Sequence, residues 1–150
     1  MFPTAKTNTP ARFASWALQI GGAGAMIAMG ALPKLTGQFP SPVLFEQLGV
    51  EPWGRYAVGL TELAAAVLLL VPRMHAFGGV LLALAMGGAF ASHVGSLGLF
   101  PEFVNAQTGE TVVLPFFISL IFLAMGAAVV LLRRDELPVP PFGAPTPAEA

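Results

Sequence analysis

The sequence predicts an all-α integral membrane protein: an up-down bundle of four transmembrane helices with a short amphipathic loop on the outer side after the first helix. Apolar residues make up 55% of the 150 residues and charged residues only 10%, whereas about a quarter of residues are charged in soluble domains. Four apolar segments approach the roughly 20 residues that a helix needs to cross a hydrocarbon core about 30 Å thick. Within a transmembrane domain of residues 13–132, the predicted spans cover residues 13–33, 54–72, 76–99 and 112–132.

The basic residues predict the orientation of these spans. Five of the seven lie in residues 1–12, at Arg73 in the second turn, or in the Pro-rich tail of residues 133–150. The other two, Lys34 and Arg55, lie at the opposite membrane edge. Because cytoplasmic loops carry an excess of Lys and Arg, we expect a multi-pass protein of the bacterial inner membrane with both termini in the cytoplasm.

The two longer loops differ in character. Residues 35–53 are punctuated by Pro and Gly but stay rich in Phe, Val and Leu. We therefore expect a short helix at residues 43–48 that lies in the membrane interface, with Trp53 as an aromatic anchor. Residues 100–111 carry two acids and no base, and are predicted to form a polar loop.

Small residues recur along the third span at every fourth position. Such spacing lets helix backbones approach closely in a membrane. We expect this helix to be the most closely packed of the set, through a stripe formed by Gly79, Ala83, Gly87, Ala91 and Gly95.

One acid, Glu62, lies within the second span. A charge at the middle of a membrane helix costs about 2.5–3.5 kcal/mol on insertion scales, and the leucines and valines around Glu62 gain roughly as much. Glu62 is therefore expected to face other helices, where a partner offsets its burial.

Four ionisable residues converge on the outer halves of the first three spans. At 1.5 Å per residue, Glu62 lies roughly 12 Å and His93 roughly 9 Å below the outer edge. Lys34 ends the first span at that edge, and Arg55 begins the second on the helix face of Glu62. In a structural interpretation the two bases reach the headgroups, Glu62 is protonated and bonded to a neighbouring helix, and His93 lies near the interface. In a functional one Glu62 and His93 form a proton-handling or ligand-contacting pair, with the bases setting the local charge.

Several classes of site are excluded or disfavoured. The sequence contains no cysteine, which excludes disulfides, thiol redox chemistry and cysteine-ligated metals. One Glu and one His supply only two ligands, and His75 lies toward the opposite membrane face, so no metal site is predicted. Phosphate-binding loops, zinc-protease and hydrolase motifs are absent from the sequence, and no basic patch indicates nucleic-acid binding.

Lys34 and four short motifs are similar to those of a known family. The motifs are Leu48-Gly49-Val50-Glu51-Pro52, Gly59-Leu60-Thr61-Glu62-Leu63, Leu70-Val71-Pro72 and Met86-Gly87-Gly88-Ala89-Phe90-Ala91-Ser92-His93. Together they resemble the DoxX-like family over about residues 13–132. The resemblance places the family's Gly-x-x-Glu on Gly59 and Glu62, its distal His on His93, and its basic residue on Lys34. It implies a four-helix membrane protein, in a family where some members are linked to quinone-coupled thiosulfate oxidation or to membrane-associated oxidative-stress complexes.

Three functions stay open at this point. The first is an accessory or structural subunit of a membrane complex, which contacts the lipid bilayer and either other subunits or a second copy of itself. The second is a quinone-linked oxidoreductase subunit, in which Glu62 and His93 handle protons and Lys34 or Arg55 polarises a quinone carbonyl. The third is a small-solute or proton carrier that uses Glu62, although the paired broken helices of known carriers are missing. The small size, the small-residue stripes and the lack of a self-sufficient catalytic set favour the first.

Overall fold

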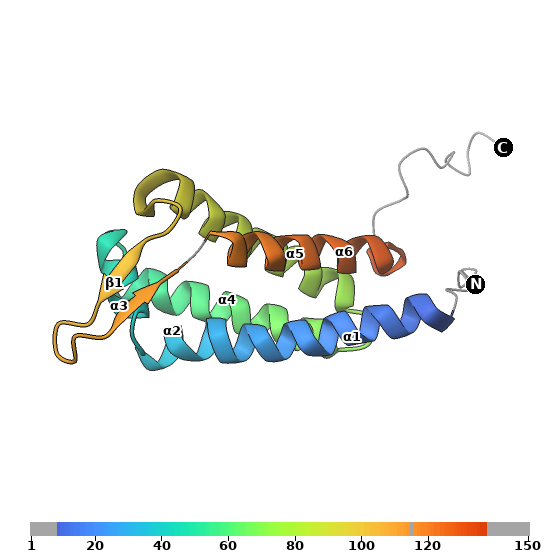
Figure 1. The fold of residues 1–150 in the computed structure, drawn as a ribbon. Coiled ribbons are helices and arrows are strands. Elements are labelled where there is room, and N and C mark those ends of the chain that lie inside the picture. Colours follow the sequence, from blue (N-terminus) through green and yellow to red (C-terminus); the bar gives the residue numbers. More distant parts are fainter. Residues whose placement is uncertain (1–8, 115, 138–150) are drawn as a thin grey trace, which may run out of the picture.

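The computed structural model describes residues 9–114 and 116–137, except for the side chains of residues 9–12 and 135. Most of the predicted N-terminal segment and of the Pro-rich tail lies outside the described residues. Long helices run lengthwise, and a small β-hairpin lies at one end of the molecule (Figure 1). The elements are α1 (Thr9–Ala25), η1 (Met26–Ala31), α2 (Leu32–Thr36), α3 (Ser41–Gln47), α4 (Trp53–Leu70), α5 (His75–Ser92), η2 (His93–Leu97), β1 (Glu102–Val104), β2 (Thr111–Val113), α6 (Phe117–Leu132) and η3 (Arg134–Glu136). Two of them, η1 and η2, are π-helical turns that continue the helices before them, and η3 is a short 3₁₀ turn.

The long helices pack around one apolar core. α1 contacts α4 and α6, α4 contacts α5, and α5 and α6 form the most extensive pair. The core contains both small and large side chains, and its alanines allow the helices to approach closely. It consists of Ala23, Met26, Ala65, Ala66, Leu69, Leu82, Met86 and Val129.

Three helical segments of the described chain are long and apolar enough to cross a membrane: Phe13–Thr36, Trp53–Leu70 and His75–Leu97. They correspond to the first three predicted spans. α6 is also apolar but has 16 residues. At 1.5 Å per residue it covers about 24 Å, compared with a hydrocarbon core about 30 Å thick. Membrane crossing by α6, and with it the four-helix transmembrane bundle and its orientation, stays a prediction.

A two-stranded antiparallel hairpin departs from the predicted all-α fold. The expected polar loop of residues 100–111 contains β1, and β2 occupies the start of the fourth predicted span, with Glu102 opposite Val113. α6 accordingly begins at Phe117, later than the sequence predicts. The three β-branched residues of β2 favour an extended backbone. Phe103 on β1 is only 2% exposed, so its burial stabilises the paired strands.

The first loop contains the short helix that its apolar composition predicts. This helix is α3, and Phe45 anchors it through a side chain that is 5% exposed. Gly37 ends the preceding helix with φ of +70°, a left-handed conformation that favours glycine. Trp53 begins α4 and is largely exposed, as an interfacial anchor would be.

α5 and α6 approach most closely at two glycines. A Cβ atom added to Gly79 would lie 2.8 Å from the carbonyl oxygen of Gly126, and one added to Gly126 would lie 2.8 Å from the carbonyl oxygen of Gly79 and 3.0 Å from the amide nitrogen of Ala83. This half of the predicted small-residue stripe therefore packs inside the chain. The other half points into open space or is exposed, and consists of Gly87, Ala91 and Gly95.

Candidate functional site

An ion pair between the first two long helices forms the centre of the candidate site. Lys34 Nζ lies 3.0 Å from Glu62 Oε1 and 2.9 Å from Oε2, and it also donates to the carbonyl oxygen of Gly30 at 3.3 Å. These contacts direct the ammonium group toward the carboxylate of Glu62 and the backbone of the first helix. The Glu62 residue is 1% exposed, whereas the Lys34 side chain is 19% exposed. Lys34 is therefore the partner that offsets the burial of Glu62.

Two glycines allow the helices to meet at this pair. A Cβ atom added to Gly30 would lie 2.9 Å from Glu62 Oε2, and one added to Gly59 would lie 3.1 Å from the Cβ atom of Lys34. Gly30 belongs to the π-helical turn η1, which leads directly into the helix of Lys34. Single π turns within helices are frequent at functional sites, where they change the direction of the following side chains.

Arg55 joins the same network without contacting the Glu62 carboxylate. Its Nε atom lies 2.7 Å and 3.0 Å from the two carboxylate oxygens of Glu51, and its Nη1 atom donates to the carbonyl oxygen of Lys34. The guanidinium carbon lies 4.5 Å from the centre of the Tyr56 ring. The sequence prediction placed Arg55 beside Glu62 because the two share a helix face. In the structure Arg55 instead ties the start of α4 to the end of the first helix.

His93 occupies a separate position at the start of η2 and is 8% exposed. Its Nδ1 atom lies 2.8 Å from the carbonyl oxygen of Ala89, and its Nε2 atom lies 3.3 Å from that of Leu114. Among the hydrogen bonds of the described residues, neither ring nitrogen of His93 contacts Glu62. The structure thus connects His93 to the segment after the hairpin and connects Glu62 to Lys34.

A second polar cluster lies at the opposite end of the helices and was missed by sequence reasoning. Gln19 Nε2 and Arg133 Nε each lie 2.9 Å from Ser15 Oγ, although Gln19 is 0% and Ser15 2% exposed. Glu136 accepts a hydrogen bond of 3.1 Å from the amide of Ala76 at the start of α5 and lies 3.8 Å from Arg133 Nη1. Within the described chain, Gln19 Oε1 and Arg133 Nη2 are buried without a partner. The sequence indicates this cluster through Ser15 and Gln19, two polar residues in an apolar span. They are four positions apart and therefore lie on one helix face.

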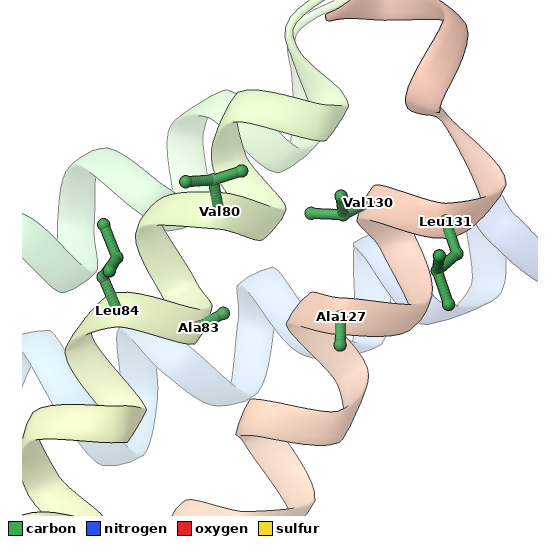
Figure 2. Close-up of a pocket in the computed structure, with 6 residues that line it drawn as sticks. All are labelled: Val80, Ala83, Leu84, Ala127, Val130 and Leu131. Atoms are coloured by element: carbon green, nitrogen blue, oxygen red, sulfur yellow. The ribbon is translucent and has the colours of Figure 1, made fainter. Parts of the chain in front are cut away.

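A groove between α5 and α6 is lined by residues with apolar side chains. Its volume is about 410 Å³. Figure 2 shows that the side chains along it come from both helices. The full lining is Val80, Ala83, Leu84, Ala127, Val130 and Leu131. Because specific small-molecule sites combine an apolar lining with a few placed polar groups, this groove suits hydrocarbon and not a polar substrate.

Comparisons with known proteins identify the chain at the level of its family. Searches of curated proteins and of solved structures found no match. Residues 18–107 match the DoxX-like family. This range includes Lys34, Glu62 and His93, and it ends within the hairpin. The chain therefore belongs to the DoxX-like family.

Proposed function

We propose that this DoxX-like membrane protein is a non-catalytic accessory subunit of a membrane protein complex. The main support is that the charged groups of the candidate site bind other groups of the same chain. Lys34 binds the carboxylate of Glu62 and the carbonyl oxygen of Gly30, and Arg55 binds Glu51 and a backbone carbonyl. These contacts hold helices together, which is what a structural network does.

Open helix surfaces support the same proposal. Transmembrane helices associate through small residues that let two backbones approach. A Cβ atom added to Gly21, Gly24, Gly87 or Gly95 would have nothing within 4 Å. These positions on α1, α5 and η2 are therefore available to a helix of another subunit or of a second copy of the chain.

A quinone-linked function receives no specific support from the described residues. A quinone carbonyl needs a hydrogen-bond donor, and the ammonium group of Lys34 is already engaged by Glu62 and Gly30. His93 already faces two carbonyl oxygens. In this conformation Lys34 and His93 are therefore engaged by groups of the chain itself.

Site-specific crosslinking in native membranes tests the accessory role. The natural sequence has no cysteine, so a single Gly87→Cys substitution gives one reactive position on the open face of α5. Leu60→Cys, at a side chain that is 58% exposed on α4, is the matched control for lipid-facing cysteine. We expect Gly87→Cys to form one discrete adduct of higher mass and Leu60→Cys to form none.

A second substitution separates association from folding. Gly87→Leu adds bulk where nothing lies within 4 Å, so we expect it to leave the thermal unfolding temperature unchanged and to abolish co-purification of the partner. A wild-type protein that remains a lone monomer in native membranes, with no adduct at Gly87→Cys or at Gly21→Cys, would contradict the proposal. Retention of a stoichiometric quinone by the purified protein would favour the redox function instead.

A further inference from the structure

The apolar groove of about 410 Å³ lies beside the crossing of α5 and α6. At the crossing, a Cβ atom added to Gly79 or to Gly126 would lie 2.8 Å from a carbonyl oxygen of the other helix. Two alanines continue into the groove, because Ala83 follows Gly79 by four residues and Ala127 follows Gly126 directly. Small-molecule sites have volumes of about 300–1,000 Å³, so the groove has the lining and the size for a hydrocarbon chain.

The position of the groove on the molecule exposes it to lipid. α5 belongs to the segment His75–Leu97, which is long and apolar enough to cross a membrane. Leu84 on α5 and Leu131 on α6 line the groove and are largely exposed. Lipid tails are as apolar as leucine, so an acyl chain in the groove needs no polar partner there. The charged groups at one end of the groove decide which lipid it favours.

Three arginines lie near that end. Leu131 in the groove lining is followed by Arg133 and Arg134 at the end of α6. Arg73 lies in the turn between α4 and α5. Val80, the first lining residue of α5, comes five residues after the start of that helix, which is about 7.5 Å along its axis. The groove therefore opens close to the basic ends of both helices.

A hydrogen bond holds these two helix ends together. Glu136 accepts a hydrogen bond of 3.1 Å from the amide of Ala76 at the start of α5, and it lies 3.8 Å from Arg133 Nη1. The carboxylate of Glu136 and the guanidinium group of Arg133 are thus engaged within the chain. Residues 71–76 and 131–137 together contain three arginines and two acids, so this end of the groove has a positive net charge.

Arg73 and Arg134 are the exposed cations of this end. Within the part of the chain that the structure describes, neither of them forms an ion pair. Arg73 also has φ of +69°, a left-handed conformation that glycine adopts with less strain. A strained residue that is kept in place of glycine points to a function of its side chain.

We propose that the groove binds one anionic phospholipid, with an acyl chain between α5 and α6 and the phosphate at Arg73 and Arg134. Basic pockets between transmembrane helices bind anionic lipid headgroups, and arginine keeps its charge in proteins. The apolar lining accepts the acyl chain of any phospholipid. The two arginines therefore supply the preference for an anionic headgroup over a zwitterionic one.

Native mass spectrometry of the purified full-length chain measures this preference. The chain is mixed with equal amounts of phosphatidylglycerol and phosphatidylcholine that carry the same acyl chains. We expect the wild type to retain one phosphatidylglycerol per chain in preference to phosphatidylcholine. Equal retention of the two lipids by the wild type would overturn the proposal without reference to any variant.

Two charge variants locate the headgroup. We expect Arg134→Gln to lower the preference about fivefold, which corresponds to about 1 kcal/mol for one basic side chain near the membrane surface. Arg73→Gly should lower it by a similar factor while the thermal unfolding temperature stays the same or rises, because glycine relaxes the turn. This separates loss of lipid binding from loss of folding. An unchanged preference in a chain with both substitutions contradicts the proposed headgroup site.

A matched pair of substitutions on α6 locates the acyl chain. Ala127 lines the groove and is exposed, whereas Ala124 is exposed on the same helix but lies outside the lining. We expect Ala127→Leu to lose the retained lipid and Ala124→Leu to keep it, with similar unfolding temperatures. Equal retention by both variants would exclude the groove. A discrete protein adduct at Ala127→Cys in native membranes would assign the groove to a helix of another protein and not to lipid.

Discussion

Replacement of Lys34 by methionine is the most informative perturbation of the ion-pair network. Methionine keeps a long unbranched side chain but removes the ammonium group that lies 2.9 and 3.0 Å from the two oxygens of Glu62. The substitution leaves the acid in place with 1% of its surface exposed. The reverse change, Glu62→Leu, leaves a base whose side chain is 19% exposed.

The difference in burial sets the expected magnitudes. Removing one partner of a buried ion pair costs about 3–5 kcal/mol because a charge is left uncompensated. Glu62 can take up a proton to avoid this charge, so we expect Lys34→Met to lower the free energy of unfolding by about 3 kcal/mol. Lys34 without its partner can extend toward the interface, so we expect Glu62→Leu to cost only about 1 kcal/mol, the value of an ordinary hydrogen bond. The double variant is expected to lie within about 1 kcal/mol of the wild type, because apolar replacement of a whole pair is often neutral.

Reversible unfolding in mixed micelles, followed by circular dichroism, measures these values as a double-mutant cycle. A coupling energy of at least about 2 kcal/mol between the two positions is expected. Arg55→Met is the matched control, because it removes a base from the same end of the helices but leaves Glu51, whose side chain is 23% exposed and hydrated. Additivity in the double variant would refute the assignment of Lys34 as the partner of Glu62, and equal losses for Lys34→Met and Glu62→Leu would refute the argument from their difference in burial.

Two further predictions use the same unfolding assay. Gly79→Ala places a Cβ atom 2.8 Å from a carbonyl oxygen of α6, and we expect overpacking to lower the free energy of unfolding by about 1–3 kcal/mol. Gly87→Ala has nothing within 4 Å of its Cβ atom, and we expect it to leave the free energy of unfolding unchanged or to raise it by up to about 1 kcal/mol through helix propensity. Similar losses at both positions would contradict the close crossing of α5 and α6. Ser15→Ala removes the acceptor shared by Gln19 Nε2 and Arg133 Nε and is expected to cost about 1–3 kcal/mol, and an unchanged stability would show that the cluster contributes nothing.

The features that the sequence predicts correctly follow from helical periodicity and from the free-energy cost of burying a charge. A buried acid in an apolar span needs a partner, and among the predicted partners only Lys34 contacts it. The first three spans follow from length and hydropathy alone. The helix in the first loop follows from its apolar composition. In each of these cases a single physical effect decides the structure, namely the burial of a charge or of apolar residues.

The missed features depend on weaker or non-local terms. Depth along a helix can be estimated from sequence, but the neighbour that a helix face meets cannot, and in the structure the ring nitrogens of His93 lie next to the carbonyl oxygens of Ala89 and Leu114. The hairpin depends on three-residue strands, whose pairing requires the burial of Phe103 by the rest of the fold. The sequence alone does not distinguish a polar loop from a short hairpin. The burial of Phe103 by the rest of the fold makes the difference.

Two different forces hold the two helix pairs of this chain together. Within a bilayer the hydrophobic effect does not drive helices against each other, so specific contacts decide which helices stay associated. The first pair depends on the ion pair of Lys34 and Glu62, and the second depends on backbone contact at Gly79 and Gly126, with no charge nearby in α6. Loss of the ion pair should therefore weaken the contact between the first long helix and α4, which Arg55 and the apolar core still hold, while α5 and α6 remain packed. Because the two helix pairs are held by different contacts, loss of the ion pair leaves the outer face of α5 unchanged. An accessory subunit without the Lys34–Glu62 pair would therefore still present Gly87 to its partner.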